Sequence, residues 1–201
     1  VVSANAYIGA YEIAQALNDG ADVIVTGRVS DPSLTLGPAI AHFGWAMDDW
    51  HKMGCGTMAG HMLECGTQVS GGYYCVPGQK PVPDMHRIGF PIAEIRADGS
   101  FSVFKADNTG GRVDDRTGRE QILYEVHDPA KYLTPDVTAD ITQVTIQSEG
   151  KDRIRVDGVT GHARPAELKV NVCYDNGYLA EAEISYAGFQ ARERAALAGE
   201  T

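Results

Sequence analysis

The sequence predicts an α/β fold in which a parallel-sheet first part is followed by a β-rich α+β second part. The apolar, β-branched run Val23–Val25 is too short for a helix and predicts a buried strand of a parallel sheet. Helices are predicted on both sides of it, over 7–17 and 33–42, and such alternation is typical of α/β proteins. Apolar and polar residues alternate within 168–186, which predicts antiparallel strands towards the C-terminus.

The helices of the first part are predicted from apolar spacing and end signals. In 7–17 apolar residues recur every three positions, and Gly20 is the expected left-handed cap. Asp31 is the expected N-cap of the second helix, with Pro32 at its first position. A third helix is predicted from Asp48 or Asp49 to Glu64. Its glycines cost helix stability and predict the close approach of another backbone or a ligand, at Gly54, Gly56 and Gly60.

The elements of the second part are predicted from turns and caps. The segment 75–87 holds three prolines and divides a domain over 1–76, lacking its N-terminal portion, from a domain over 88–201. Asp98–Gly99 predicts one hairpin and Asn176–Gly177 another. A Thr117–Glu120 capping box predicts a helix over 119–126. Further strands are predicted over 141–147, 153–159, 168–174 and 180–186, and a final helix over 188–198.

Composition narrows the class of protein. The net charge of -10 argues against nucleic-acid binding, which needs clustered lysine and arginine. No apolar stretch approaches the roughly 20 residues that span a bilayer, and residues 1–19 lack a signal-peptide pattern. The four cysteines have no zinc-site spacing. We therefore expect a cytoplasmic protein with reduced thiols, no metal and no membrane segment. Because the chain starts at Val1 without methionine, we also expect an internal fragment of a longer protein.

Polar side chains crowd the carboxyl end of the predicted strand. Thr26, Arg28 and Asp31 lie there, and ligands of open α/β sheets bind at this edge beside helix N-termini. We predict that these three residues bind substrate, with Arg28 holding a carboxylate or phosphate. The alternative is that Asp31 only caps the helix and Arg28 only forms an ion pair.

The predicted glycine-containing helix carries the densest chemistry. Thr57, His61 and Cys65 share one face at spacings of four, and Glu64 is within reach of the His61 ring. His61, Glu64 and Cys65 are therefore the predicted catalytic set, for acid–base or nucleophilic chemistry. The alternative is a buried histidine with one hydrogen bond and an inert cysteine packed nearby.

A third candidate is Ser70–Gly71–Gly72, which follows this helix. Consecutive backbone N–H groups in such a segment can bind an anion, so Ser70, Gly71 and Gly72 are predicted to bind substrate. An ordinary turn is the alternative. We expect Arg28 and Asp31 to converge with His61, Glu64 and Cys65 on one cleft.

Six blocks of the chain carry a resemblance to a known family: 20–38, 59–66, 89–94, 123–129, 132–137 and 183–188. In these blocks the sequence is similar to the acyclic terpene utilisation family, the AtuA-type proteins. The resemblance covers nearly the whole chain, and family members extend further before the position of Val1. It implies a link to bacterial breakdown of citronellol- and geraniol-type terpenes and related branched acyl compounds, but gives no reaction and no catalytic residues.

Two functions are expected from these residues and this resemblance. The first is a catabolic enzyme acting on a branched acid or its coenzyme A thioester, by hydration, dehydration or isomerisation. The second is a non-catalytic subunit that binds such a substrate and presents it to a partner enzyme. We expect a small-molecule substrate, no cofactor, and assembly as a homo-oligomer or with a catabolic partner subunit.

Overall fold

The computed structural model describes residues 1–76, 78–179, 181, 183 and 185–199. The chain divides into two compact units, Ala4–Asn171 and Val1–Ser3 with Val172–Thr201. In the second of these units the described helix is α5, Ala191–Gly199, where the sequence predicts a helix over 188–198. The predicted domains 1–76 and 88–201 stay a prediction.

The fold is mixed α+β, with antiparallel sheets in place of the predicted parallel sheet. One sheet has the order β2-β3-β7-β6 and is antiparallel throughout, with β2 Pro91–Ile95, β3 Phe101–Lys105, β6 Thr145–Gly150 and β7 Arg153–Asp157. A second, also antiparallel, has the order β4-β5-β8, with β4 Tyr132–Leu133, β5 Thr138–Asp140 and β8 Thr160–His162. The third pairs β1, Ser3–Ala6, with β9, Val170–Cys173.

The prediction of a buried strand at Val23–Val25 is wrong. These residues form no strand, and Val23 and Val25 are 81% and 92% exposed. Parallel pairing near them is limited to one isolated bridge, between Ile8 and Val29. A β-branched run forms a buried strand only where a partner strand lies beside it and another element covers it. Here the bridge is at Val29, beyond the run Val23–Val25.

The helices of the first part are close to their predicted positions. They are α1 Tyr11–Asn18, α2 Ser33–Phe43 and α3 Trp50–Glu64. Gly20 has a φ of +89°, and the C-cap of α2 is the left-handed Gly44. Asp49 caps α3 through a hydrogen bond from the Lys52 N–H. The predicted cap of α2 is wrong, because its N-cap is Pro32, with no side-chain cap, so the Asp31 carboxylate is not used there.

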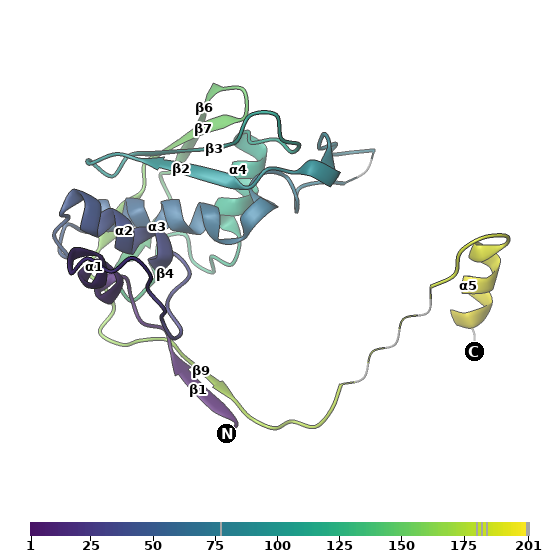
Figure 1. Cartoon of the computed structure of the whole chain (residues 1–201), viewed down its shortest axis with the longest axis horizontal. Helices are drawn as coiled ribbons and strands as arrows, with labels where there is room; N and C mark the ends of the chain where they lie inside the picture. Colours follow the sequence, from purple (N-terminus) through teal and green to yellow (C-terminus); the bar gives the residue numbers. More distant parts are fainter. Residues whose placement is uncertain (77, 180, 182, 184, 200–201) are drawn as a thin grey trace. The chain divides into compact units, whose positions relative to one another are not determined.

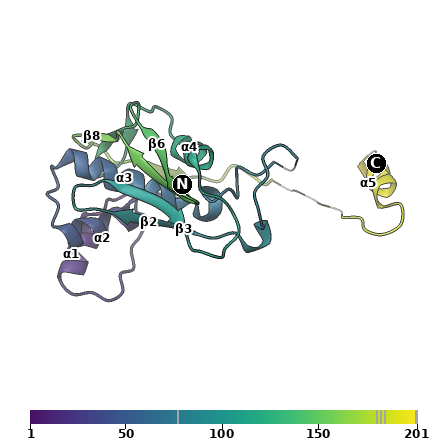
Figure 2. The ribbon, with the colours of Figure 1, turned by 90° about the horizontal axis from the view of Figure 1, so that it is seen from above.

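Helix α3 is the centre of the larger unit. It packs against α2, α4 (Asp115–Leu123) and strands of both the four-stranded and three-stranded sheets. Figure 1 shows it beneath the four-stranded sheet, and in Figure 2 strands of that sheet lie across it. The predicted close approach of another backbone is confirmed at Gly54 and Gly60, whereas Gly56 meets only side chains. A Cβ at Gly54 would lie 2.9 Å from the Thr160 carbonyl oxygen, and one at Gly60 2.7 Å from that of Pro32.

Two clusters of apolar side chains form the core around α3. One joins α3 to the four-stranded sheet and α4, and includes the fully buried Met58, Phe101 and Ile154. The other joins α3 to α1 and α2, and includes Leu36 and Met53. Burial on both sides explains why α3 has no polar face through its middle.

Of the two hairpins predicted in the second part, the one at Asp98–Gly99 is confirmed, and the one at Asn176–Gly177 is not formed by the described residues. Gly99 lies in the β2–β3 hairpin with a φ of +91°. The predicted capping box is wrong by one turn: Asp114 is the N-cap of α4 and Thr117 its third residue. The predicted strand over 168–174 is in part β9, but β9 pairs with β1. Of its predicted partner over 180–186, Ala180, Ala182 and Ile184 lie outside the described residues, and the described ones form no strand.

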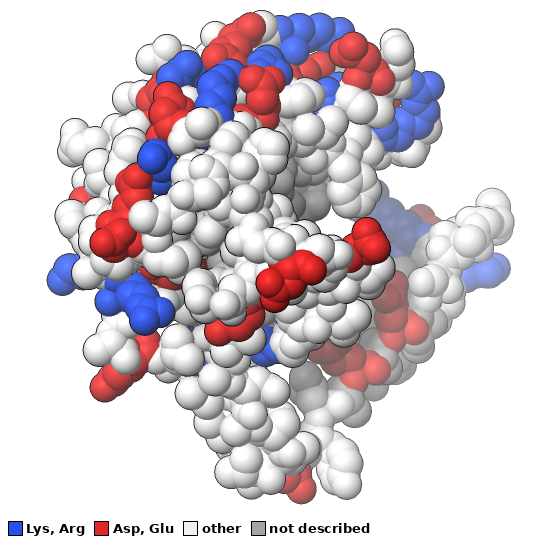
Figure 3. All heavy atoms as spheres, turned by 60° about the vertical axis from the view of Figure 1, so that its left-hand side comes forward, with Lys and Arg blue, Asp and Glu red and all other residues white. Residues whose placement is uncertain are grey.

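Charged side chains of the four-stranded sheet pair with one another. Glu94 accepts from Arg96 and Arg153, and Arg155 pairs with Asp157. Figure 3 shows basic and acidic side chains interspersed along the upper part of one face. Such mixed, solvated pairs contribute little stability. No helix among the described residues has the length and apolar character needed to cross a bilayer.

Candidate functional site

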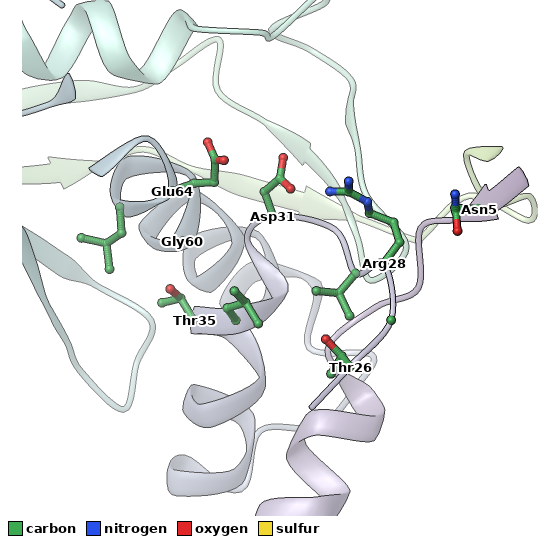
Figure 4. A pocket seen from close by; sticks show the side chains of 11 residues that line it. Asn5, Thr26, Arg28, Asp31, Thr35, Gly60 and Glu64 are labelled. Atoms are coloured by element: carbon green, nitrogen blue, oxygen red, sulfur yellow. The ribbon is translucent and has the colours of Figure 1, made fainter. Parts of the chain in front are cut away.

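A hollow of about 730 Å³ lies where the loop before α2 meets the C-terminal end of α3. We call it the Arg28 pocket, and Figure 4 shows its labelled side chains. The loop contributes Arg28 and Asp31, α2 contributes Thr35, and α3 contributes Gly60 and Glu64. The remaining lining residues are Asn5, Thr26, Gly27, Val29, Leu34 and Leu63.

The pocket combines one cation with two carboxylates. In Figure 4 the Arg28 side chain extends towards Asp31, and Asp31 and Glu64 hold their carboxylates on the same side. No ion pair between described side chains involves Arg28 or Asp31. Leu34, on the pocket wall, is 64% exposed and offers apolar surface to the hollow.

A second hollow, of about 480 Å³, shares Arg28, Asp31 and Glu64 with the Arg28 pocket. We call it the Tyr7 lobe. It is more polar than the first, because most of its other lining side chains carry hydrogen-bonding groups. They are Tyr7, Ser30, Glu125, His127, Tyr132, Leu133, Pro135 and Lys169.

His61 does not line either hollow. Its side chain is buried, and its Nε2 lies 2.9 Å from the Gln121 carbonyl oxygen while the Gln121 side chain donates back to the His61 carbonyl at 2.8 Å. This pair of hydrogen bonds joins α3 to α4. The His61 ring also packs edge-on against Tyr132, at 5.3 Å between centroids. The arrangement is that of a buried histidine that holds structure together, and its predicted catalytic role stays a prediction.

Glu64 and Cys65 are joined by a hydrogen bond. The Cys65 thiol donates to the Glu64 carboxylate at 2.8 Å. Burial and this hydrogen bond raise the pKa of Cys65 to about 11. The side chain is therefore a neutral thiol near pH 7, and a thiol is a far weaker nucleophile than a thiolate. Glu64 lines both hollows, whereas Cys65 lines neither.

The Ser70–Gly72 segment is placed as a turn. Its N–H groups are used locally: Ser70 and Gly72 donate to the Thr67 carbonyl, and Gly71 donates to the Gln68 carbonyl. These donors are not free for an anion. The structure thus brings Thr26, Arg28, Asp31 and Glu64 to one pocket, and does not bring His61, Cys65, Ser70, Gly71 or Gly72 there.

Burial of His61 predicts a pH dependence of stability. Burial lowers the pKa of His61 in the folded chain, in spite of the Gln121 hydrogen bond, while the unfolded value is about 6.5. A base with a depressed folded pKa contributes stability above the unfolded pKa, and this is lost as the pH falls below it. We expect the melting temperature of the wild type to fall as the pH is lowered from 7.5 to 5.5. The melting temperature of His61→Gln should fall less over the same range. The surface variant His42→Gln should retain the wild-type slope; a His61→Gln curve parallel to the wild type would contradict the assignment.

Comparison with known proteins gives the family of the chain. No curated protein sequence and no solved structure matches it. The model of one protein family, described as acyclic terpene utilisation family protein AtuA, matches residues 1–201. This match covers all of the sequence blocks in which the resemblance was found. The chain belongs to the acyclic terpene utilisation family AtuA.

Proposed function

We propose that the chain is a catabolic enzyme that acts on a branched acyclic terpenoid acid, or its coenzyme A thioester, by hydration, dehydration or isomerisation. One observation carries the proposal: Arg28, Asp31 and Glu64 line a single pocket together with apolar side chains. The family description, which names acyclic terpene utilisation, supports the substrate class.

Each group in the pocket has a chemical use in such a reaction. Arg28 can hold the polar end of an acid through two parallel hydrogen bonds. Leu34 and Leu63 offer apolar surface to a branched chain. Hydration, dehydration and double-bond migration each need a proton removed at one position and delivered at another, and Asp31 and Glu64 can serve as that acid–base pair. We assign no proton transfer to His61 or Cys65.

The Arg28 anchor is tested by a conservative substitution. Arg28→Lys is expected to weaken binding of geranic acid about tenfold, because lysine cannot reproduce a bidentate grip on a carboxylate. Isothermal titration calorimetry measures the affinity. Arg119→Lys, at an exposed position of α4 outside both hollows, is the matched control and should bind as the wild type does. Equal affinities for wild type and Arg28→Lys would remove Arg28 from the site.

The choice between enzyme and binding subunit depends on turnover. Geranic acid and its coenzyme A thioester are incubated with the protein in deuterated water, and mass spectrometry follows product formation and deuterium uptake. The enzyme proposal expects turnover that is lost in the paired variant Asp31→Asn with Glu64→Gln. Tight binding of either compound without product or exchange would favour the substrate-binding subunit instead.

A further inference from the structure

We infer that the Tyr7 lobe is an anion subsite in which Lys169 and Arg28 together hold the carboxylate of the substrate, so that the site selects the free acid. The inference rests on the proposed function. It adds Lys169 as a second cation of the site and the free acid as the form of the substrate that binds.

Backbone hydrogen bonds join the segments that carry the two cations to the segment that contains Tyr7. The Tyr7 N–H donates to the Lys169 carbonyl at 2.9 Å. The next residue, Ile8, donates to the Arg28 carbonyl at 3.2 Å and accepts from the Ser30 N–H at 2.9 Å. Three segments that are remote in sequence therefore lie side by side, with Tyr7 in the middle.

Both cations also lie against the Tyr7 ring. The Arg28 guanidinium carbon is 5.2 Å from the ring centroid, and the Lys169 Nζ is 4.8 Å from it. An aromatic ring attracts a cation through its quadrupole and adds no net charge. The ring thus positions Arg28 and Lys169 without neutralising either of them.

Neither cation has a carboxylate partner among the described side chains. Ion pairs occupy Lys52, Lys80, Lys105 and five arginines elsewhere in the chain, but not Arg28 or Lys169. The two distances to one ring centroid place the positive charges within about 10 Å of each other, so an anion in the lobe is attracted to both of them.

The rest of the lobe fits a single small anion better than a polyanion. It is also lined by the carboxylates of Asp31, Glu64 and Glu125, which repel any anion in proportion to its charge and therefore oppose a phosphate-rich carrier more than a single carboxylate. Tyr132 lines the same lobe, and burial, followed by the nearby charge of Asp31, raises its pKa. Its hydroxyl therefore stays protonated and can donate a further hydrogen bond to a carboxylate oxygen.

The two hollows together orient the substrate. Arg28, Asp31 and Glu64 form their common wall, and the apolar residues Val29, Leu34 and Leu63 line only the Arg28 pocket. A carboxylate held in the Tyr7 lobe by Arg28 and Lys169 directs the branched chain of the acid into the Arg28 pocket. Asp31 and Glu64 then lie beside the carbons next to the carboxylate, where proton transfer is needed.

Calorimetric titration with ligands that differ in their charged end tests the subsite. The probes are geranic acid, the uncharged geraniol, and the coenzyme A thioester of geranic acid. Wild type is expected to bind the acid at least about tenfold more tightly than geraniol, since hydrogen bonds to charged groups are the stronger ones. Lys169→Met should lower affinity for the acid by about tenfold and leave affinity for geraniol unchanged.

Two further variants separate the subsite from folding effects. Lys151→Met, an exposed lysine that lines a different hollow, should bind all three probes as the wild type does. Tyr7→Phe keeps the ring and should retain the acid affinity, whereas Tyr7→Leu should lose it to a similar extent as Lys169→Met. Circular dichroism melting confirms that each variant is folded.

Each outcome decides something specific. If the wild type binds the acid and Lys169→Met binds it equally well, the subsite is wrong and the proposed function stands. If Lys169→Met weakens the thioester but not the acid, the anion is a phosphate of the carrier, and the assignment to the carboxylate is wrong. If the wild type binds none of the probes, the proposed function fails and the subsite fails with it.

Discussion

Replacing Asp136 by alanine is expected to lower the free energy of unfolding by about 2 kcal/mol. The Asp136 side chain is buried and accepts the Ala10 N–H at 2.8 Å and the Ser33 hydroxyl at 3.4 Å. Ala10 is the N-cap of α1 and Ser33 the first residue of α2, and neither helix has a side-chain cap of its own. One carboxyl group thus satisfies donors at two helix N-termini, and alanine leaves them buried without a partner.

The loss of stability on Asp136→Ala should also depend on pH, because the Asp136 carboxyl can ionise. Burial raises the pKa of Asp136 in the folded chain above its usual 3.8. A carboxyl whose folded pKa is raised contributes most below its unfolded pKa, and part of that contribution is lost as the pH rises through the folded value. The loss on Asp136→Ala, measured by urea unfolding, should therefore be larger at about pH 4, near the unfolded pKa, than at pH 7.5.

Asp136→Asn is the matched variant, because it keeps an acceptor oxygen and cannot ionise. Asp136→Asn should be less destabilised than Asp136→Ala at both pH values. Relative to the wild type, its free energy of unfolding should be highest at pH 7.5, where the wild-type carboxyl loses part of its contribution. Equal losses for the alanine and asparagine variants would show that hydrogen bonding at the two helix termini is not what Asp136 contributes.

The elements predicted correctly from the sequence depend on local signals. Gly20 and Gly44 adopt left-handed conformations that end α1 and α2, and Gly99 does the same in the β2–β3 hairpin. Glycine adopts this conformation without steric cost, so the residue type alone marks the position. Gly54 and Gly60 of α3 are a second local signal, because a residue without a side chain allows another backbone to approach closely. The sequence does not show which backbone that is.

The sheet type was not predictable in this way. Whether Val23–Val25 pairs depends on which strand lies beside it, and the residue that reaches this segment is Ile8, which bridges to Val29. A β-branched run looks the same whether it is covered or exposed. The burial of a strand is a property of its neighbours, so the local pattern could not separate a buried strand from an exposed loop.

The sequence predicts those site residues that lie close together in the chain or on one predicted helix. Thr26, Arg28 and Asp31 are close in sequence, and Glu64 was found from its place on the glycine-containing helix. Tyr7, Tyr132 and Lys169 were missed, because distant segments bring them to the Tyr7 lobe. A single lysine in an alternating strand carries no signal of its own. His61 was chosen for its helical spacing, which marks a shared face but not whether that face borders a cavity or another helix.

A second large loss of stability is expected at Gly60. In an exposed helix, glycine to alanine stabilises by about 1 kcal/mol. At Gly60 the added Cβ would lie 2.7 Å from both the Cα and the carbonyl oxygen of Pro32. Backbone atoms cannot rotate away, so α3 and the start of α2 must separate. We expect Gly60→Ala to lower the free energy of unfolding by about 2 kcal/mol.

Gly56→Ala, on the same helix, is the control for this effect. Its Cβ would meet the end of the Leu36 side chain at 2.7 Å and the Trp45 ring at 2.9 Å, and side chains can adjust where a backbone cannot. Its loss in urea unfolding should therefore be smaller. Because Pro32 follows Asp31 and Gly60 lines the Arg28 pocket, Gly60→Ala should also weaken binding of geranic acid, while Gly56→Ala should not. Equal stability of Gly60→Ala and Gly56→Ala would mean that the backbone at Pro32 can move away from α3 without loss of stability. The contact between α2 and α3 would then not set the position of Asp31 relative to Glu64.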